Sequence, residues 1–326
     1  MKLNYFRIIL LLFFGLLIQI SATFSSYKIV LDDSKFLMEG LFQILVTDLD
    51  ENVQSEVVVA GKNYTGQELF IYWLTIDNNF KPVVKWQSEN LFEDRSVLWV
   101  TTGKFQNDKQ QLLGVTNTKF YVYQVENDGL QLTEQFSHNL KPLNITAGDI
   151  DGDGKDEVIV ARIGQVTSKI YNGYIEVWKL ENGQWTEIAE TGLLGNIRGI
   201  SAGDINEDGQ AEIFVEEGPQ LDSGNIHVIS YKENKFTEIS LLKKPVKGAV
   251  YSLKVRKFPE GMRLLTGSSS GRINVFNWNG LNLIKESTEL SFSSGLVDLE
   301  TADLNNNQQL EIYVLGYPQR LIILNQ

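Results

Sequence analysis

Two segments of this chain place oxygen-bearing side chains at alternate positions, a spacing that suits a calcium ion. Calcium takes six to eight oxygen ligands from carboxylates, amides and backbone carbonyls. A short loop with such groups at every second residue can wrap one ion if a glycine lets it turn sharply. In the first segment the predicted ligands are Asp149, Asp151, Asp153, the carbonyl of Lys155, and Glu157. In the second segment they are Asp204, Asn206, Asp208, Gln210 at the position of Lys155, and Glu212.

Two weaker copies of this pattern lie nearer the ends of the chain. One has Asp48, Asp50, Asn52 and Glu56, and the other has Asp303, Asn305, Asn307 and Glu311. Asp, Asn and Gly are also good turn formers, so such a segment can be an ordinary turn without an ion. Alternating carboxylates repel one another unless a cation lies between them, and this favours calcium in the two strong copies. The residues leave both interpretations open for the copy at Asp48 and favour a plain turn for the copy at Asp303.

The residues that follow the strong copies decide which kind of calcium loop is present. The alternate spacing overlaps with that of an EF-hand, which needs a helix on each side and a glutamate at its twelfth position. Residues 158–160 (VIV) and 213–215 (IFV) are instead β-branched or aromatic, and such runs favour strands. We therefore exclude an EF-hand and predict loops between paired strands.

The loops belong to a unit that repeats about every 50 residues along the chain. Residues 102–115 and 253–266 hold the two expected positions between the acidic copies; they keep the apolar strand pattern, lose the carboxylates and are predicted to be metal-free. Each unit continues with alternating strands, such as residues 174–180, bounded by Gly or Asn turns. Six units of four strands predict an all-β fold, a six-bladed β-propeller.

The two ends of the chain supply the strand that the sixth unit lacks. The sixth unit stops after its third strand at residues 320–324, and residues 27–31 form a spare strand before the first loop. Pairing these two segments would close the ring and leave no exposed blade edge. We predict a single propeller domain over residues 23–326, closed by its N-terminal strand.

The units resemble FG-GAP/VCBS-type repeats, the calcium-loop blades of integrin-α-like propellers and of many secreted bacterial proteins. The acidic loops carry the resemblance, which spans residues 40–326 and is most specific at Asp149 and Asp204. It implies a propeller with two to three calcium ions held structurally in its blade loops. The chain departs from the family at the last ligand position, where it has Glu and the family often has Asp.

Composition excludes several other kinds of protein. The chain has 326 residues, a formal net charge of -12 and no cysteine. Nucleic-acid binding needs clustered Lys and Arg, which this chain lacks, and a disulfide framework or thiolate zinc site needs Cys. Lys2 and Arg7 precede an apolar run at residues 8–18 and the small residue Ala22, which is typical of a secretory signal peptide over residues 1–22. We expect a secreted or cell-surface protein without a membrane span after signal cleavage; an uncleaved signal anchor is the alternative.

The sequence has no phosphate loop and no His-Glu-x-x-His helix, and we find no set of residues spaced for catalysis. We therefore expect a non-catalytic binding or adhesion module, a monomer that recognises an extracellular protein or glycan. Trp86, Trp99 and Trp185 could offer faces for sugar stacking, although aromatic side chains also fill cores. A secreted carbohydrate-active enzyme, a polysaccharide lyase or hydrolase, is the first alternative, because one fold can host unrelated functions. A purely structural envelope protein is the second.

Overall fold

The computed structural model describes residues 28–33, 40–52, 54–63, 68–77, 79–91, 97–106, 108–127, 129–166, 171–192, 194–218, 222–258, 260–303, 310–317 and 320–325. The predicted signal peptide lies outside the described residues. Within them every regular element is a strand. None of the described residues belongs to a helix long and apolar enough to cross a bilayer.

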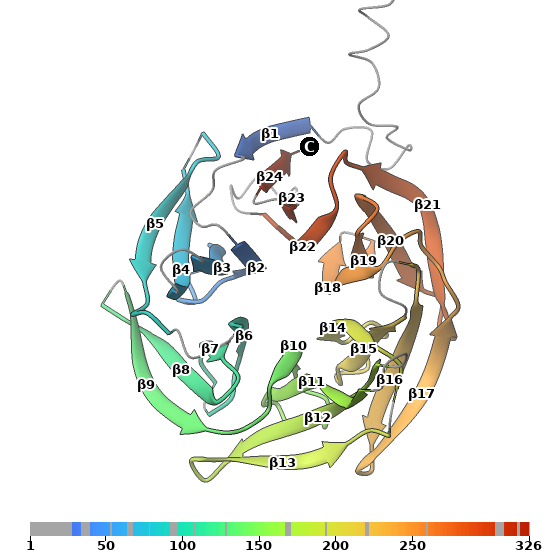
Figure 1. Cartoon of the computed structure of the whole chain (residues 1–326), viewed down its shortest axis with the longest axis horizontal. Coiled ribbons are helices and arrows are strands. Elements are labelled where there is room, and N and C mark those ends of the chain that lie inside the picture. Colours follow the sequence, from blue (N-terminus) through green and yellow to red (C-terminus); the bar gives the residue numbers. More distant parts are fainter. Residues whose placement is uncertain are drawn as a thin grey trace, which may run out of the picture.

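The strands form six four-stranded antiparallel sheets, arranged as blades around a common axis (Figure 1). Blade one consists of β2 (Gly40–Thr47), β3 (Glu56–Asn63), β4 (Glu68–Ile76) and β5 (Pro82–Gln87). Blade two consists of β6 (Trp99–Gly103), β7 (Gln111–Val115), β8 (Lys119–Glu126) and β9 (Gly129–Ser137). Blade three consists of β10 (Pro142–Gly148), β11 (Glu157–Val166), β12 (Tyr171–Glu181) and β13 (Gln184–Glu190).

The second half of the ring repeats this order. Blade four consists of β14 (Ile197–Gly203), β15 (Glu212–Glu217), β16 (Asn225–Lys232) and β17 (Lys235–Leu242). Blade five consists of β18 (Val250–Phe258), β19 (Gly261–Ser268), β20 (Arg272–Trp278) and β21 (Leu283–Ser291). Blade six consists of β22 (Leu296–Ala302), β23 (Glu311–Gly316), β24 (Arg320–Asn325) and β1 (Lys28–Asp33). The first strand of each blade in this order lies nearest the axis (Figure 1).

The pattern of burial explains why the sequence forms these strands. Second strands such as β7 and β23 are buried along their whole length, because neighbouring blades cover both of their faces. Their sequences are accordingly continuous apolar runs rather than alternating ones. Outermost strands such as β13 contain only exposed and half-buried residues, because one face meets solvent.

The hydrophobic core lies between neighbouring blades rather than inside any one sheet. One cluster packs Ile159 and Val177 of blade three against Ile213 of blade four. Another packs Val57 of blade one against Tyr313 of blade six. Each blade is therefore stabilised by its neighbours, and the ring has to be closed for the first and last blades to be covered.

The N-terminal strand closes the ring, as predicted. β1 pairs antiparallel with β24, with Lys28 opposite Asn325 and Asp33 opposite Leu321. The sixth blade thus takes three strands from the C-terminal end of the chain and one from the N-terminal end (Figure 1). The predicted six-bladed propeller is confirmed.

Candidate functional site

The acidic loops connect the innermost strand of a blade to its second strand. They join β2 to β3 in blade one, β10 to β11 in blade three and β14 to β15 in blade four. Because all blades share one strand order, these loops lie at the same end of the propeller. In blade six, Asp303 and Glu311 are described, but Asn305 and Asn307 lie outside the described residues. The loop positions of blades two and five have Gln111 and Arg263 where the acidic loops have their last glutamate.

The loop of blade three is shaped by the carboxylate of Asp149. Its Oδ1 accepts hydrogen bonds from the amides of Gly152 (2.7 Å) and Asp153 (3.1 Å), and its Oδ2 accepts one from Gly154 (2.8 Å). Gly154 has a φ of 87°, in the left-handed region that favours glycine. The loop therefore curls around Asp149 and brings the next acidic side chains to one side. The backbone amide of Lys155 donates to Asp153 Oδ1 at 3.0 Å.

The last glutamate of each described acidic loop is buried at the base of the loop. Glu56, Glu157 and Glu212 each accept a hydrogen bond through Oε2, from the amides of Leu49 (3.0 Å), Ile150 (3.1 Å) and Ile205 (3.2 Å). Burial, together with the charges of aspartates in the same loop, raises the pKa of each of these three glutamates to about 7, although the backbone hydrogen bonds lower it. A cation placed among these groups would lower the pKa values and stabilise the ionised forms.

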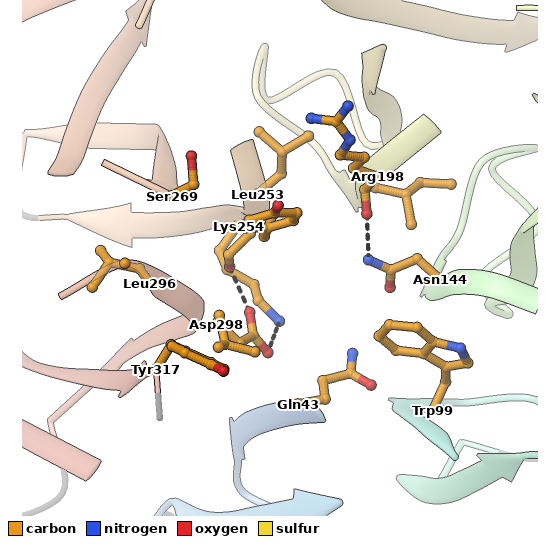
Figure 2. A pocket seen from close by; sticks show the side chains of 15 residues that line it. Gln43, Trp99, Asn144, Arg198, Leu253, Lys254, Ser269, Leu296, Asp298 and Tyr317 are labelled. Atoms are coloured by element: carbon orange, nitrogen blue, oxygen red, sulfur yellow. Dashed lines mark hydrogen bonds and ion pairs between the residues drawn. The ribbon is translucent and has the colours of Figure 1, made fainter. Parts of the chain in front are cut away.

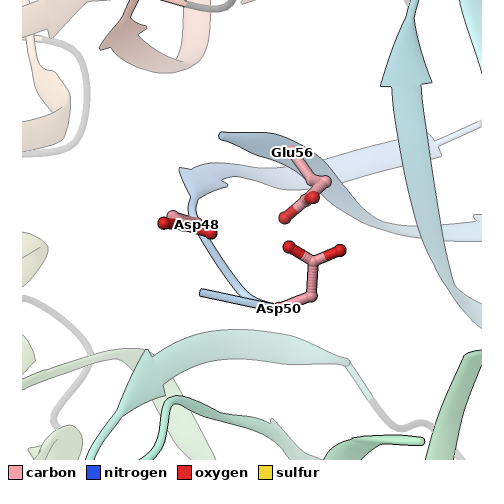
Figure 3. Close-up of side chains that lie close together, drawn as sticks. All are labelled: Asp48, Asp50 and Glu56. Atoms are coloured by element: carbon pink, nitrogen blue, oxygen red, sulfur yellow. The ribbon is translucent and has the colours of Figure 1, made fainter. Parts of the chain in front are cut away.

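In two loops the carboxylates are close enough to share one cation. One oxygen from each of three residues lies within 4.8 Å of the others; the sets are Asp48, Asp50 and Glu56 (Figure 3), and Asp149, Asp151 and Glu157. Oxygens on one calcium ion each lie about 2.3–2.6 Å from it, so a mutual separation of this size is compatible with shared coordination. In blade one, the amide of Asn52 donates to Asp48 Oδ1 at 2.9 Å. The donor sets of both loops thus fit a hard cation in chemistry and spacing.

The loop of blade four has the same backbone design with a different side-chain arrangement. Asp204 accepts hydrogen bonds from the amides of Asp208 (3.0 Å) and Gly209 (2.8 Å). The Asn206 amide group donates to Glu212 Oε1 at 2.6 Å. The Gln210 side chain leaves its own loop and donates to the carbonyl of Asp151 at 2.9 Å, so it connects the loops of blades three and four.

Lysine side chains, which the sequence pattern did not include, reach these loops from other strands. Lys85 Nζ lies 3.5 Å from Asp50, and Lys232 Nζ lies 2.9 Å from Asp208. Lys179 Nζ lies 2.5 Å from Asp151, 2.8 Å from Asp153 and 2.9 Å from Glu157. Each lysine lies on a later strand of its blade, so no local motif could have indicated it.

A second candidate site is a pocket of about 580 Å³ on the axis, lined by residues from all six blades (Figure 2). Its lining residues lie mostly near the starts of the innermost strands, whereas the acidic loops follow the ends of these strands. The pocket and the acidic loops therefore belong to opposite ends of the propeller. The walls combine aromatic, apolar and polar side chains, among them Trp99, Tyr251, Tyr317, Leu253, Leu296, Gln43, Arg198 and Lys254.

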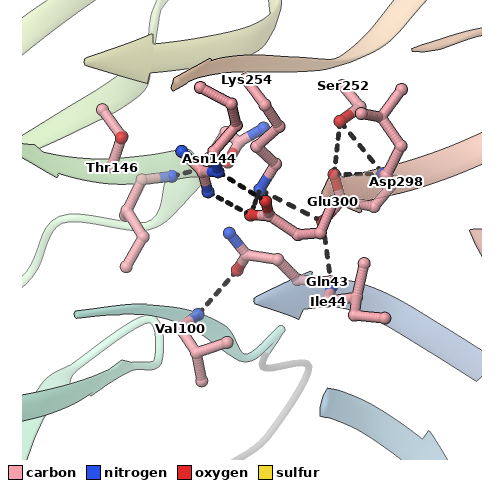
Figure 4. A network of polar contacts seen from close by, with 12 residues as sticks. Gln43, Ile44, Val100, Asn144, Thr146, Ser252, Lys254, Asp298 and Glu300 are labelled. Carbon is pink, nitrogen blue, oxygen red and sulfur yellow. Dashed lines mark hydrogen bonds and ion pairs between the residues drawn. The ribbon is translucent and has the colours of Figure 1, made fainter. Parts of the chain in front are cut away.

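A buried carboxylate, Asp298, ties three blades together beside this pocket (Figure 4). Its Oδ1 accepts hydrogen bonds from Ser252 Oγ of blade five (2.5 Å) and from the amide of Leu299 (2.9 Å). Its Oδ2 accepts one from the amide of Ile44 in blade one (2.9 Å). Burial raises the pKa of Asp298, whereas the Lys254 ammonium at 3.6 Å and these hydrogen bonds lower it.

Side chains at matching positions of other innermost strands make similar cross-blade contacts (Figure 4). Gln43 Oε1 accepts from the amide of Val100 at 2.8 Å, and Asn144 Nδ2 donates to the carbonyl of Arg198 at 3.0 Å. Blade four has Gly199 at this position, within the register shift between Ile197 and Ile200. The buried Glu216 of β15 lies opposite this shift.

The environment of Glu216 is unfavourable for a charge. Burial raises its pKa to about 7, and this effect outweighs the Arg198 guanidinium and the amides of Val250 and Gly224, which lower it. Both carboxylate oxygens are fully buried and make no hydrogen bond of ordinary geometry among the described residues.

The three tryptophans that were candidates for sugar stacking have different environments. Trp99 lines the central pocket and donates through Nε1 to the carbonyl of Pro142 at 3.2 Å. Trp86 packs edge-on against Tyr123 with a centroid distance of 5.5 Å, and Trp185 packs edge-on against Phe120 at 5.2 Å. Only Trp99 of these three belongs to the central pocket.

Comparisons with known proteins support the fold and leave the family open. No protein-family model matches this chain, and no curated protein sequence matches it. Among solved structures, the chain is similar to BBS1N in its complex with ARL6DN, with a TM-score of 0.54 and 12% sequence identity over 92% of this chain and 96% of that chain. At this identity the likeness shows the β-propeller fold alone. Membership of the FG-GAP/VCBS repeats remains a prediction.

Proposed function

We propose that this chain is a non-catalytic binding module, secreted or held at the cell surface, that recognises an extracellular protein or glycan. The observation that carries the proposal is the central pocket. Ligand sites are usually concave and largely apolar, with a few polar groups that orient the ligand. Trp99, Tyr251 and Tyr317 supply aromatic surface there, and Gln43 and Arg198 supply polar groups.

The acidic residues near the pocket favour binding over catalysis. A polysaccharide lyase or hydrolase would need acidic groups that are free to act on a substrate. Asp298 is engaged by Ser252 and two backbone amides. Glu300 accepts hydrogen bonds from Arg256 at 2.6 and 2.9 Å, and Lys254 lies 3.1 Å away. Both carboxylates thus act as ties between blades, and the buried Glu216 does not line the pocket, which supports a non-catalytic role.

The structural neighbour offers one example of the fold in a protein complex, since BBS1N was solved together with ARL6DN. It shares only the fold with this chain, so it does not identify a partner. It supports the simpler point that a propeller of this size can serve as a protein-binding surface.

Calcium enters the proposal as a structural ion of the acidic loops. The Asp48, Asp50 and Glu56 set supports it by its spacing, and the Asp204 loop supports it by its backbone design. Because these loops lie at the end opposite the pocket, the ions would stabilise the strand connections rather than contact the partner. Blade three is treated separately below.

The test is a binding screen of residues 23–326 against glycan and extracellular-protein arrays, with a turnover assay on a polysaccharide panel. The informative variant is Tyr317→Ser, which alters a pocket residue that is 72% exposed and so should not disturb the core. The matched control is Leu281→Ser, because Leu281 is 74% exposed and does not line the pocket.

We expect at least one ligand that binds without turnover, with Tyr317→Ser weakening binding about tenfold, equivalent to about 1.4 kcal/mol. Leu281→Ser should bind like the wild type. Turnover of a polysaccharide would favour the carbohydrate-active enzyme instead. If Tyr317→Ser bound the ligand as tightly as Leu281→Ser, the binding site would not include the pocket.

A further inference from the structure

Lys179 occupies the position in blade three where the predicted ligands converge. It lies on β12, its side chain is buried, and its ammonium contacts three carboxylates: Asp151 at 2.5 Å, Asp153 at 2.8 Å and Glu157 at 2.9 Å. These are three of the five residues that the sequence assigns to calcium in this loop. The contact with Asp151 Oδ2 is a hydrogen bond, and those with Asp153 and Glu157 are ion pairs.

The strand register shows that this arrangement is specific to blade three. Val158 pairs with Trp178, which places Lys179 beside Glu157. In blade four, Ile213 pairs with Ile229, and the residue beside Glu212 is Ser230. The same positions in blades one and six are Thr75 and Asn325. Among these four acidic blades, blade three alone has a cation at this position.

Lys85 and Lys232, which also lie near acidic loops, are placed differently. Lys85 and Lys232 each form an ion pair with a single carboxylate, at 3.5 and 2.9 Å. The Lys232 side chain is 54% exposed, so its contact lies at the rim of the loop. Lys179, in contrast, is enclosed by the carboxylates of its loop.

A calcium ion and this ammonium cannot both lie among the same oxygens. The ion would have to expel Lys179 from a buried position, and the expelled ammonium would then lack the carboxylates that compensate its charge. The lysine is also attached to a packed strand, so it reaches the carboxylates without the entropy loss of capturing a free ion.

We propose that Lys179 is the resident cation of blade three, and that this loop folds without a metal although its acidic residues match a calcium loop. The chain then takes calcium only through its other acidic loops. This inference is independent of the partner-binding function.

The test is a count of bound calcium by native mass spectrometry, with melting curves in calcium and in chelator. Lys179→Met removes the ammonium, and Lys179→Ser copies the residue of blade four. The matched control is Lys232→Met, which removes a lysine that pairs with only one carboxylate of an acidic loop, that of Asp208. Asp151→Asn in the wild-type background probes blade three without changing the lysine.

We expect Lys179→Met and Lys179→Ser each to bind one calcium ion more than the wild type. Their melting temperatures should fall by roughly 5–10 °C in chelator and recover in calcium. Lys232→Met should bind as many ions as the wild type, and so should Asp151→Asn.

Two results would refute the proposal. One is the loss of one ion in Asp151→Asn, which would place calcium in blade three of the wild type. The other is folded lysine variants that gain no ion. If the lysine variants do not fold, the Asp151→Asn count decides. If the wild type binds no calcium at all, the prediction of calcium in the other loops is wrong. A calcium ion bound by Lys179→Met but not by the wild type would still support the role of the lysine.

Discussion

Replacing Glu216 by Gln should make the protein more stable above neutral pH. Glu216 is fully buried between β14 and blade five, and burial raises its pKa from an ordinary 4.5 to about 7. Because the unfolded chain releases this proton first, folding is favoured at low pH and loses stability as the pH rises from about 4.5 through about 7. Glutamine resembles the protonated acid in size and polarity but cannot ionise.

The size of the effect follows from the shift in pKa. Each pKa unit corresponds to about 1.4 kcal/mol, so ionisation of Glu216 lowers the free energy of unfolding by about 2–3 kcal/mol between pH 5 and pH 8. Glu56, Glu157 and Glu212 also have pKa values raised to about 7 and contribute slopes of the same sign. The difference between variant and wild type isolates the contribution of Glu216.

The measurement is urea unfolding followed by tryptophan fluorescence at pH 5 and pH 8. At pH 5 the Glu216→Gln variant and the wild type should differ by less than about 1 kcal/mol, and at pH 8 the variant should be more stable by about 3 kcal/mol. Glu181→Gln, at an exposed position, serves as the control. A constant difference between Glu216→Gln and wild type at both pH values would show that burial does not control this carboxyl group.

Three further predictions concern the ring and its loops. Asp298→Asn removes the charge that accepts three hydrogen bonds between blades five, six and one, so the free energy of unfolding in urea should fall by about 3 kcal/mol; an unchanged midpoint would contradict its role as a tie. Deleting residues 1–34 removes β1 and leaves β24 as an open edge, so size-exclusion chromatography should show aggregates; a monomer with the wild-type melting temperature would contradict closure by this strand. Chelator should lower the melting temperature of the wild type by several degrees, and added calcium should restore it. A melting temperature that is the same with and without chelator would contradict the calcium proposal.

The repeating unit and its strands could be predicted from the sequence, because the signals that specify them are local. Alternation at residues 174–180 predicted the strand that the structure shows as β12 (Tyr171–Glu181), and the spacing of Asp48, Asp149 and Asp204 predicted one loop at the same place in each blade. The spare segment at residues 27–31 predicted the closing strand, because a last blade with three strands needs one more edge strand.

The lysine contacts of the loops and the contacts beside the pocket depended on tertiary structure, because they join residues that are distant along the chain. Lys179 meets Asp151 across 28 positions, and Asp298 meets the amide of Ile44 across 254. Strand register decides which side chain lies beside Glu157, and ring closure decides which innermost strands border the pocket. The sequence by itself therefore determined where acidic groups gather. Only the folded blade placed a lysine ammonium among these carboxylates, because Lys179 reaches them through the pairing of β12 with β11.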